Sequence, residues 1–216
     1  MRNILNKMAV LGLLAAFTAC SVELPGGGDP GRIFVLSPKS TFEEGLPTVD
    51  WQLLVDVPIT ANGIGNSRIA LRQTAMELKY YSHANWTDSA PKMIQALLIE
   101  SFENSGKIVS VGRQTIGLRA DFIMQSDLRE FQAEYLDGDG AGPTVRVRMN
   151  AKLIKMPERV IVASKTVEKT VKAEDKNLDM VIVAYDEALG KVMKRIVGWA
   201  LKSGEEVWRD KGRVGS

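Results

Sequence analysis

The stretch TVRVRMNAKLIKM at residues 144–156 constrains the fold most, because its side chains alternate in polarity. From position 145 to position 150, valine or methionine alternates with arginine or asparagine. Successive side chains of a strand point to opposite faces, so this strand has one apolar face and one wet face, as in an antiparallel sheet. The apolar face needs a second layer to cover it. The stretch therefore predicts a sheet with a helical layer on one side.

Further segments rich in β-branched and aromatic residues predict the other strands of this sheet. The glycine-rich DGDGAGP at 137–143 predicts a hairpin loop, and Met156-Pro157-Glu158 predicts a second turn. The expected strands lie at 32–36, 51–59, 67–73, 76–82, 107–112, 119–136 and 159–173.

Residues 86–107 have a helical period instead, since apolar residues recur at positions 94, 97, 98 and 102. Asp88 or Ser89 can cap the free amide groups of the first turn, and Pro91 is tolerated there because its missing N–H is not needed. Gly106 suits the left-handed residue that ends a helix. The segment therefore predicts one well-bounded helix.

A second, broader apolar stripe predicts a helix over 178–202 that packs on the sheet, and the polar residues 203–216 predict a disordered tail. Together these patterns predict an α+β fold. It has a mostly antiparallel or mixed sheet with two main helices packed on one face. We expect a single domain over residues 32–202.

The N-terminus has the pattern of a secretory signal peptide over residues 1–19. Arg2 and Lys7 form a positive region, and an apolar run over 8–17 follows. This run is about half of the roughly 20 residues that a membrane-spanning helix needs, so a permanent transmembrane anchor is not expected. The small residues after it lead directly into Cys20, the only cysteine of the chain.

The tetrapeptide Phe17-Thr18-Ala19-Cys20 resembles the lipobox of bacterial lipoproteins, although Phe17 stands where leucine is usual. The resemblance implies a diacylglyceryl thioether on Cys20 and cleavage just before it. An ordinary secretion signal with an incidental cysteine is the alternative. Ser21 replaces the aspartate that usually retains lipoproteins at the inner membrane, which favours the outer membrane. Residues 20–31, rich in Gly and Pro, predict a flexible tether.

The expected mature body gives no electrostatic reason to bind nucleic acid. The chain has 28 basic and 26 acidic residues, and two of the basic ones lie in the signal, so residues 20–216 carry no net formal charge. With one cysteine in the chain, an intramolecular disulfide is excluded.

Residues that could carry chemistry are sparse. His83 is the only histidine, and the sequence nominates neither a nucleophile nor an orienting partner for it, so a hydrolase is the weakest of the functions considered. No metal site is expected, since one histidine and one lipidated cysteine cannot complete a zinc site, and DGDG at 137–140 lacks the other ligands of a calcium loop. The glycines of 62–67 lack the spacing of a nucleotide-binding loop, and no cofactor is expected.

Four aromatic residues lie in or beside the expected strands: Trp51, Tyr80, Tyr81 and Trp86. They could line a lipid-binding groove or form part of the core. The core is favoured, because large aromatic side chains dominate burial in small domains.

Residues 68–108 resemble the central block of the ABC-type transport auxiliary lipoproteins, the Pqi-type lipoproteins that accompany MCE-domain (mammalian-cell-entry-like) lipid transporters. The matching features are the tyrosine strand, Trp86 followed by Asp88, Pro91 at the helix start and SFENSGK at its end. Two later segments, RADFIMQSDLREFQAEY and VIVAYDEALGKVMKRIVGW, also fit, so the resemblance spans about residues 20–200.

The resemblance implies a noncatalytic, lipid-anchored periplasmic component of a phospholipid or hydrophobic-compound transport system. Its partners would be an MCE-domain protein with an ABC permease and ATPase. We expect either the sheet edges or the exposed face around Trp86 and Asp88 to bind the MCE partner. The second placement is favoured because a tryptophan stands beside a turn there. The alternative is an envelope-assembly lipoprotein that binds or plugs an outer-membrane protein. The sequence leaves open whether the chain forms a homo-oligomer.

Overall fold

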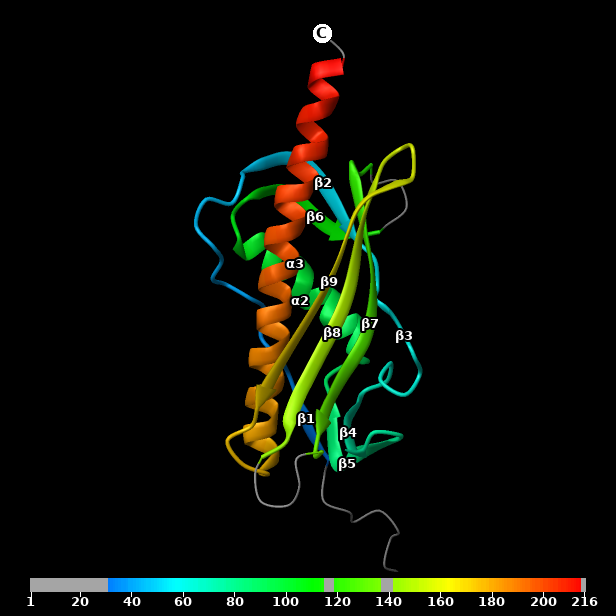
Figure 1. Cartoon of the computed structure of the whole chain (residues 1–216), viewed down its shortest axis with the longest axis vertical. Helices are drawn as coiled ribbons and strands as arrows, with labels where there is room; N and C mark the ends of the chain where they lie inside the picture. The colour runs from blue at the N-terminus through cyan, green and yellow to red at the C-terminus, as the bar shows by residue number, and fades with distance from the viewer. Residues whose placement is uncertain (1–30, 115–118, 137–141, 215–216) are drawn as a thin grey trace, which may run out of the picture. The chain divides into compact units, whose positions relative to one another are not determined.

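Strand β7 (Phe122–Glu134) organises the sheet, because other strands pair with both of its edges. The computed structural model describes residues 31–114, 119–136 and 142–214. Along one edge, β7 pairs over its whole length with antiparallel β8 (Thr144–Lys155), which pairs in turn with β9 (Val160–Lys172). This confirms the two expected hairpins (Figure 1).

The other edge of β7 is shared by three strands that run parallel to it. These are β2 (Val49–Val55) at its start, β3 (Ile59–Thr60) in the middle and β4 (Arg68–Thr74) at its end. β2 continues the sheet to parallel β6 (Ile108–Arg113), while β4 continues it to β5 (Glu77–Trp86) and β1 (Arg32–Phe34). The sheet is therefore mixed, and the predicted α+β class is confirmed.

Helices α2 (Ala90–Asn104) and α3 (Leu178–Val214) supply the second layer on one face of this sheet (Figure 1). α2 begins after Ser89, has Pro91 in its first turn and is followed by Gly106 with a φ of 60°, as predicted. The Ser89 side chain makes no capping bond, and Asp88 accepts the Ser89 amide N–H at 2.6 Å.

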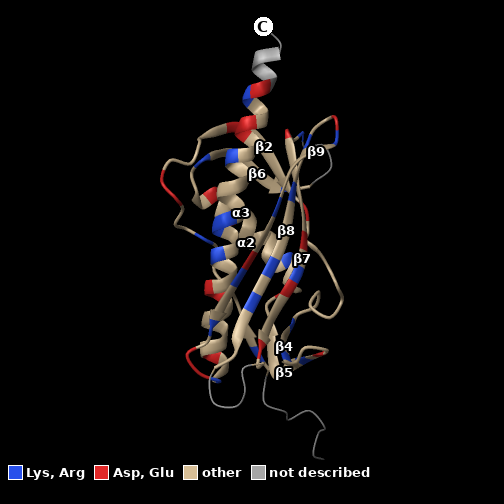
Figure 2. Ribbon diagram, in the orientation of Figure 1, with Lys and Arg blue, Asp and Glu red and all other residues tan. Residues whose placement is uncertain are grey.

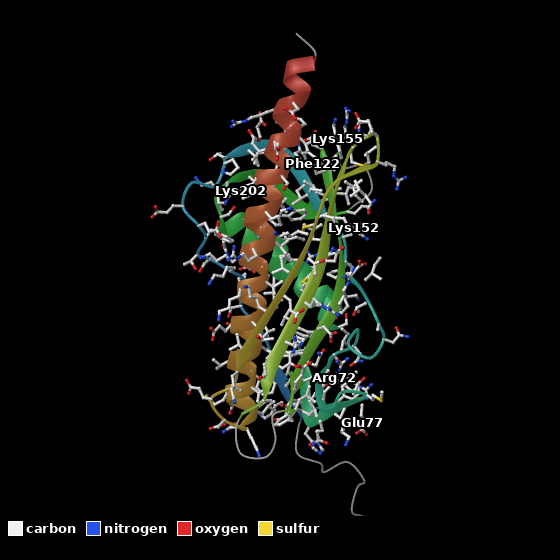
Figure 3. All side chains as sticks on the ribbon, viewed as in Figure 1. Arg72, Glu77, Phe122, Lys152, Lys155 and Lys202 are labelled. Carbon is white, nitrogen blue, oxygen red and sulfur yellow. The ribbon has the colours of Figure 1, made fainter. Side chains whose placement is uncertain are left out.

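The prediction of a disordered tail over 203–216 is wrong for 203–214, because α3 continues to Val214. Residues 203–214 are mostly polar, but a narrow strip of this part of the helix is apolar. The Trp208 ring lies 6.4 Å from that of Phe122, and Gly204 leaves room for Trp51. Phe122 lies beside this C-terminal part of α3 (Figure 3).

An aromatic cluster fills the space between α3 and the sheet. The ring of Tyr185 lies 5.1 Å from both Trp86 and Phe131, and its hydroxyl donates to the Ala70 carbonyl at 2.6 Å. All three rings are at most 2% exposed, and Trp51 is fully buried. The preference for a core role is thus confirmed for Trp86 and Trp51.

The opposite face of the sheet carries a ladder of ion pairs across β4, β7, β8 and β9. Glu130 accepts from Arg148 at 3.0 Å and lies 3.5 Å from Arg72. Arg146 bonds Glu134 at 3.0 Å and also pairs with Glu168 on β9. Figure 2 shows basic segments along β8 beside acidic segments on β7. Positively and negatively charged side chains alternate on this face, so their charges largely cancel.

Candidate functional site

A concavity lies beside the turn that joins β5 to α2. It has a volume of about 640 Å³. Its wall combines residues after β1 and β2, the turn itself, the first turns of α2 and the end of β6. The lining residues are Val35, Leu36, Val57, Thr87, Asp88, Lys92, Met93, Gln95, Ala96, Leu97 and Arg113. We call this concavity the α2 pocket.

The interior of the α2 pocket is mainly apolar. Met93 and Leu97 line it from α2 and are 5% and 7% exposed. The one amide in the wall is already satisfied, since Gln95 Nε2 donates to the Val55 carbonyl at 2.8 Å. Val35 and Val57 remain 69% and 44% exposed, so apolar surface faces water at the pocket.

Charged side chains border the same pocket. Asp88, Lys92 and Arg113 are among its lining residues, and no ion pair of Lys92 or Arg113 occurs within the described part of the chain. Nearby, burial raises the pKa of the Asp56 carboxyl, which lies between the last residue of β2 and Val57. The pocket therefore joins an apolar interior to a rim with two cations and one carboxylate.

The structure separates the two residues expected to bind a partner. Trp86 is 2% exposed and packs under α3, so the prediction that it forms part of an exposed face is wrong. Its position at the end of β5 directs the indole to the helix side of the sheet. Asp88, two residues later, is exposed at the rim of the α2 pocket.

His83 lies exposed on β5 with a φ of 53°, in a stretch where the pairing with β4 is irregular. Its side chain makes no hydrogen bond to any described residue. Among the described residues there is also no group of three or more His, Cys, Asp or Glu that could hold a metal ion.

Several expectations lie outside the described residues. These are the signal peptide over 1–19, the lipidation of Cys20, the tether up to residue 30 and the DGDG turn at 137–140. Within the described ranges, neither helix combines the length and apolar character that a membrane crossing requires.

The α2 pocket itself had no sequence signal. Val57, Lys92 and Arg113 come from three separate segments, and only the folded chain brings them to one cavity. The exposure of Val35 and Val57 is a property of the folded chain and cannot be read from the sequence.

Comparison with known proteins agrees with the fold and the earlier resemblance. A sequence model of the family described as ABC-type transport auxiliary lipoprotein component matches residues 34–197. A crystal structure of a protein from Xanthomonas campestris, assigned to the family DUF330, has 32% sequence identity and a TM-score of 0.78. The superposition covers 83% of this chain and 99% of the Xanthomonas chain.

Two further similarities are more distant. An uncharacterized protein of Bradyrhizobium diazoefficiens is 26% identical over 193 residues, which is 88% of this chain and 51% of that relative. The chain thus spans about half the length of this curated relative. A second crystal structure, of an uncharacterized protein, shares the fold with 11% identity and a TM-score of 0.62, over 78% of this chain and 97% of the other.

Proposed function

We propose that this chain, which belongs to the ABC-type transport auxiliary lipoprotein family, is the envelope-anchored binding component of an MCE-associated transport system for phospholipids or other hydrophobic compounds. The observation that carries the proposal is the family match over residues 34–197, which takes in most of the sheet, α2 and the first half of α3. The matches are to auxiliary lipoproteins and related folds and not to an enzyme family. We therefore propose a noncatalytic role.

The proposed anchor is a lipidated Cys20, with the body facing the periplasm from the outer membrane. Eleven residues lead from Cys20 to Gly31, where the described body begins, and an extended chain of this length reaches about 38 Å. A flexible chain averages roughly 18 Å. Tethering at this distance would raise the effective concentration of the body near a membrane-bound partner.

We propose that Asp88 and the turn around it contact the MCE partner. Asp88 is exposed at the border of the α2 pocket, so its carboxylate is accessible to a protein partner. Trp86 then acts indirectly, by fixing the end of β5 from which the turn begins. Asp88→Ala should weaken partner capture without changing the fold, whereas Glu100→Ala, an exposed carboxylate further along α2, should leave capture unchanged.

Affinity purification from detergent-solubilised envelopes, followed by mass spectrometry, tests the proposal. We expect an MCE-domain protein with an ABC permease and ATPase to copurify with the wild-type chain. Recovery of an outer-membrane protein without these components would favour the envelope-assembly alternative and contradict the proposal.

A further inference from the structure

We propose that the α2 pocket binds a single-chain anionic amphiphile, a molecule with one hydrocarbon chain and a carboxylate or phosphate head. The inference rests on the proposed function, because it names a ligand class for a component of hydrophobic-compound transport. It differs from the docking proposal in that the pocket is the binding site and the turn around Asp88 is its border.

The interior of the pocket fits a hydrocarbon chain. Six of its lining residues are aliphatic or methionine, and its polar amide, Gln95, is held by the Val55 carbonyl. A volume of about 640 Å³ lies in the range of small-molecule sites, which is roughly 300–1,000 Å³. A single side chain from a protein partner would leave much of this space unfilled. Removing the exposed surface of Val35 and Val57 from water would drive the chain of an amphiphile inward.

The border of the pocket favours an anionic head. Lys92 and Arg113 both line it, and among the described residues neither forms an ion pair. Asp88, whose carboxylate accepts the Ser89 amide N–H at 2.6 Å, keeps its negative charge, so the border holds two cations against one carboxylate. Lys92 also lies in the first turn of α2, where the helix dipole adds positive potential. A carboxylate or phosphate would accept charge-assisted hydrogen bonds from Lys92 and Arg113.

The place of the pocket along the chain also favours a lipid-derived ligand. Val35 follows Cys20 by only 15 residues, so an anchored chain would hold the pocket within roughly 50 Å of a leaflet. Amphiphiles that leave a bilayer one at a time would be available at this distance.

Titration calorimetry on the mature chain with Cys20→Ser tests the inference, since no anchor lipid then competes for the pocket. The probes are laurate, myristate, the corresponding lysophosphatidylglycerols and an uncharged monoacylglycerol, all below their micelle concentrations. We expect saturable 1:1 binding of the anionic probes that tightens about tenfold or more for two added methylenes. A preference between carboxylate and lysophospholipid heads would identify the source of the ligand.

Matched variants locate the site. Ala96→Trp should fill the pocket and weaken binding more than tenfold, while Glu100→Trp, one turn further along the exposed side of α2, should not. The double variant Lys92→Gln/Arg113→Gln should weaken anionic probes about tenfold and leave the monoacylglycerol unchanged. Lys92 and Arg113 both lie at the surface, so the double variant should keep the fold. It therefore tests the inference even if Ala96→Trp disturbs the fold.

No saturable binding, or equal binding by the charge variant, would overturn the inference. If the chain binds no amphiphile but the transport components still copurify with it, the ligand assignment is wrong and the proposed function is not affected. If Ala96→Trp remains folded and abolishes copurification while wild type binds no amphiphile, the pocket is a protein-docking site and the inference is wrong.

Discussion

Replacing Trp86 with alanine should destabilise the whole domain, because this residue is a core residue and not a docking residue. Its indole is 2% exposed and contacts two aromatic rings, at 5.6 Å from Phe131 and 5.1 Å from Tyr185. Tryptophan-to-alanine changes in cores cost about 3–5 kcal/mol, and each aromatic pair contributes about 0.5–1.5 kcal/mol of such a loss. For a domain of this size, we expect Tm to fall by about 6–20 °C.

Trp86→Phe is the matched variant. It keeps one ring in the cluster, and it removes an indole N–H that has no acceptor among the described residues. We therefore expect a cost of only about 1–2 kcal/mol. Urea unfolding of both variants, followed by circular dichroism, measures the difference. A Trp86→Ala protein with wild-type stability and reduced partner capture would refute the reasoning and restore Trp86 as a docking residue.

Three further changes test other contacts. Gly204→Ala should lower the free energy of unfolding by about 1–3 kcal/mol, measured by thermal unfolding, because the added Cβ would lie 2.6 Å from Cζ2 of Trp51. Unchanged stability would show that the C-terminal part of α3 does not pack against Trp51. Glu130→Gln should lower the free energy of unfolding by about 1–3 kcal/mol, because Arg72 and Arg148 lose the carboxylate that they share. The loss should be smaller at high salt, which screens these ion pairs. Burial raises the pKa of the Asp56 carboxyl, so folding favours its protonated form. The contribution of Asp56 to the free energy of unfolding is therefore present at low pH and is lost as pH rises through the folded-state pKa. Asp56→Asn should therefore raise stability at pH 7 and flatten the pH profile of unfolding, and a loss at pH 7 would contradict this.

Periodicity predicted the elements that depend on local sequence. The alternation at 145–150 identified β8 and its apolar face, and the three- and four-residue spacing, with Pro91 and Gly106, bounded α2. Local patterns could not show which strands share an edge of β7, because parallel pairing joins segments separated by a long crossover.

Errors arose where tertiary packing overrides local composition. Residues 203–214 appear polar and frayed, yet Trp208 and Gly204 pack against buried aromatic rings and extend α3. Trp86 stands beside a turn, which suggested exposure, but strand alternation directs it into the core. The α2 pocket could not be predicted at all, since its wall exists only in the folded chain.

The intact mass of the protein purified from membranes tests the central claim most directly, namely that Cys20 anchors this body to the envelope. We expect a chain that begins at residue 20 and carries the added mass of a diacylglyceryl group, with or without an amide-linked acyl chain. Cys20→Ser should lose this mass and leave the membrane fraction. A bare Cys20, or a serine variant that fractionates like the wild type, would contradict the account.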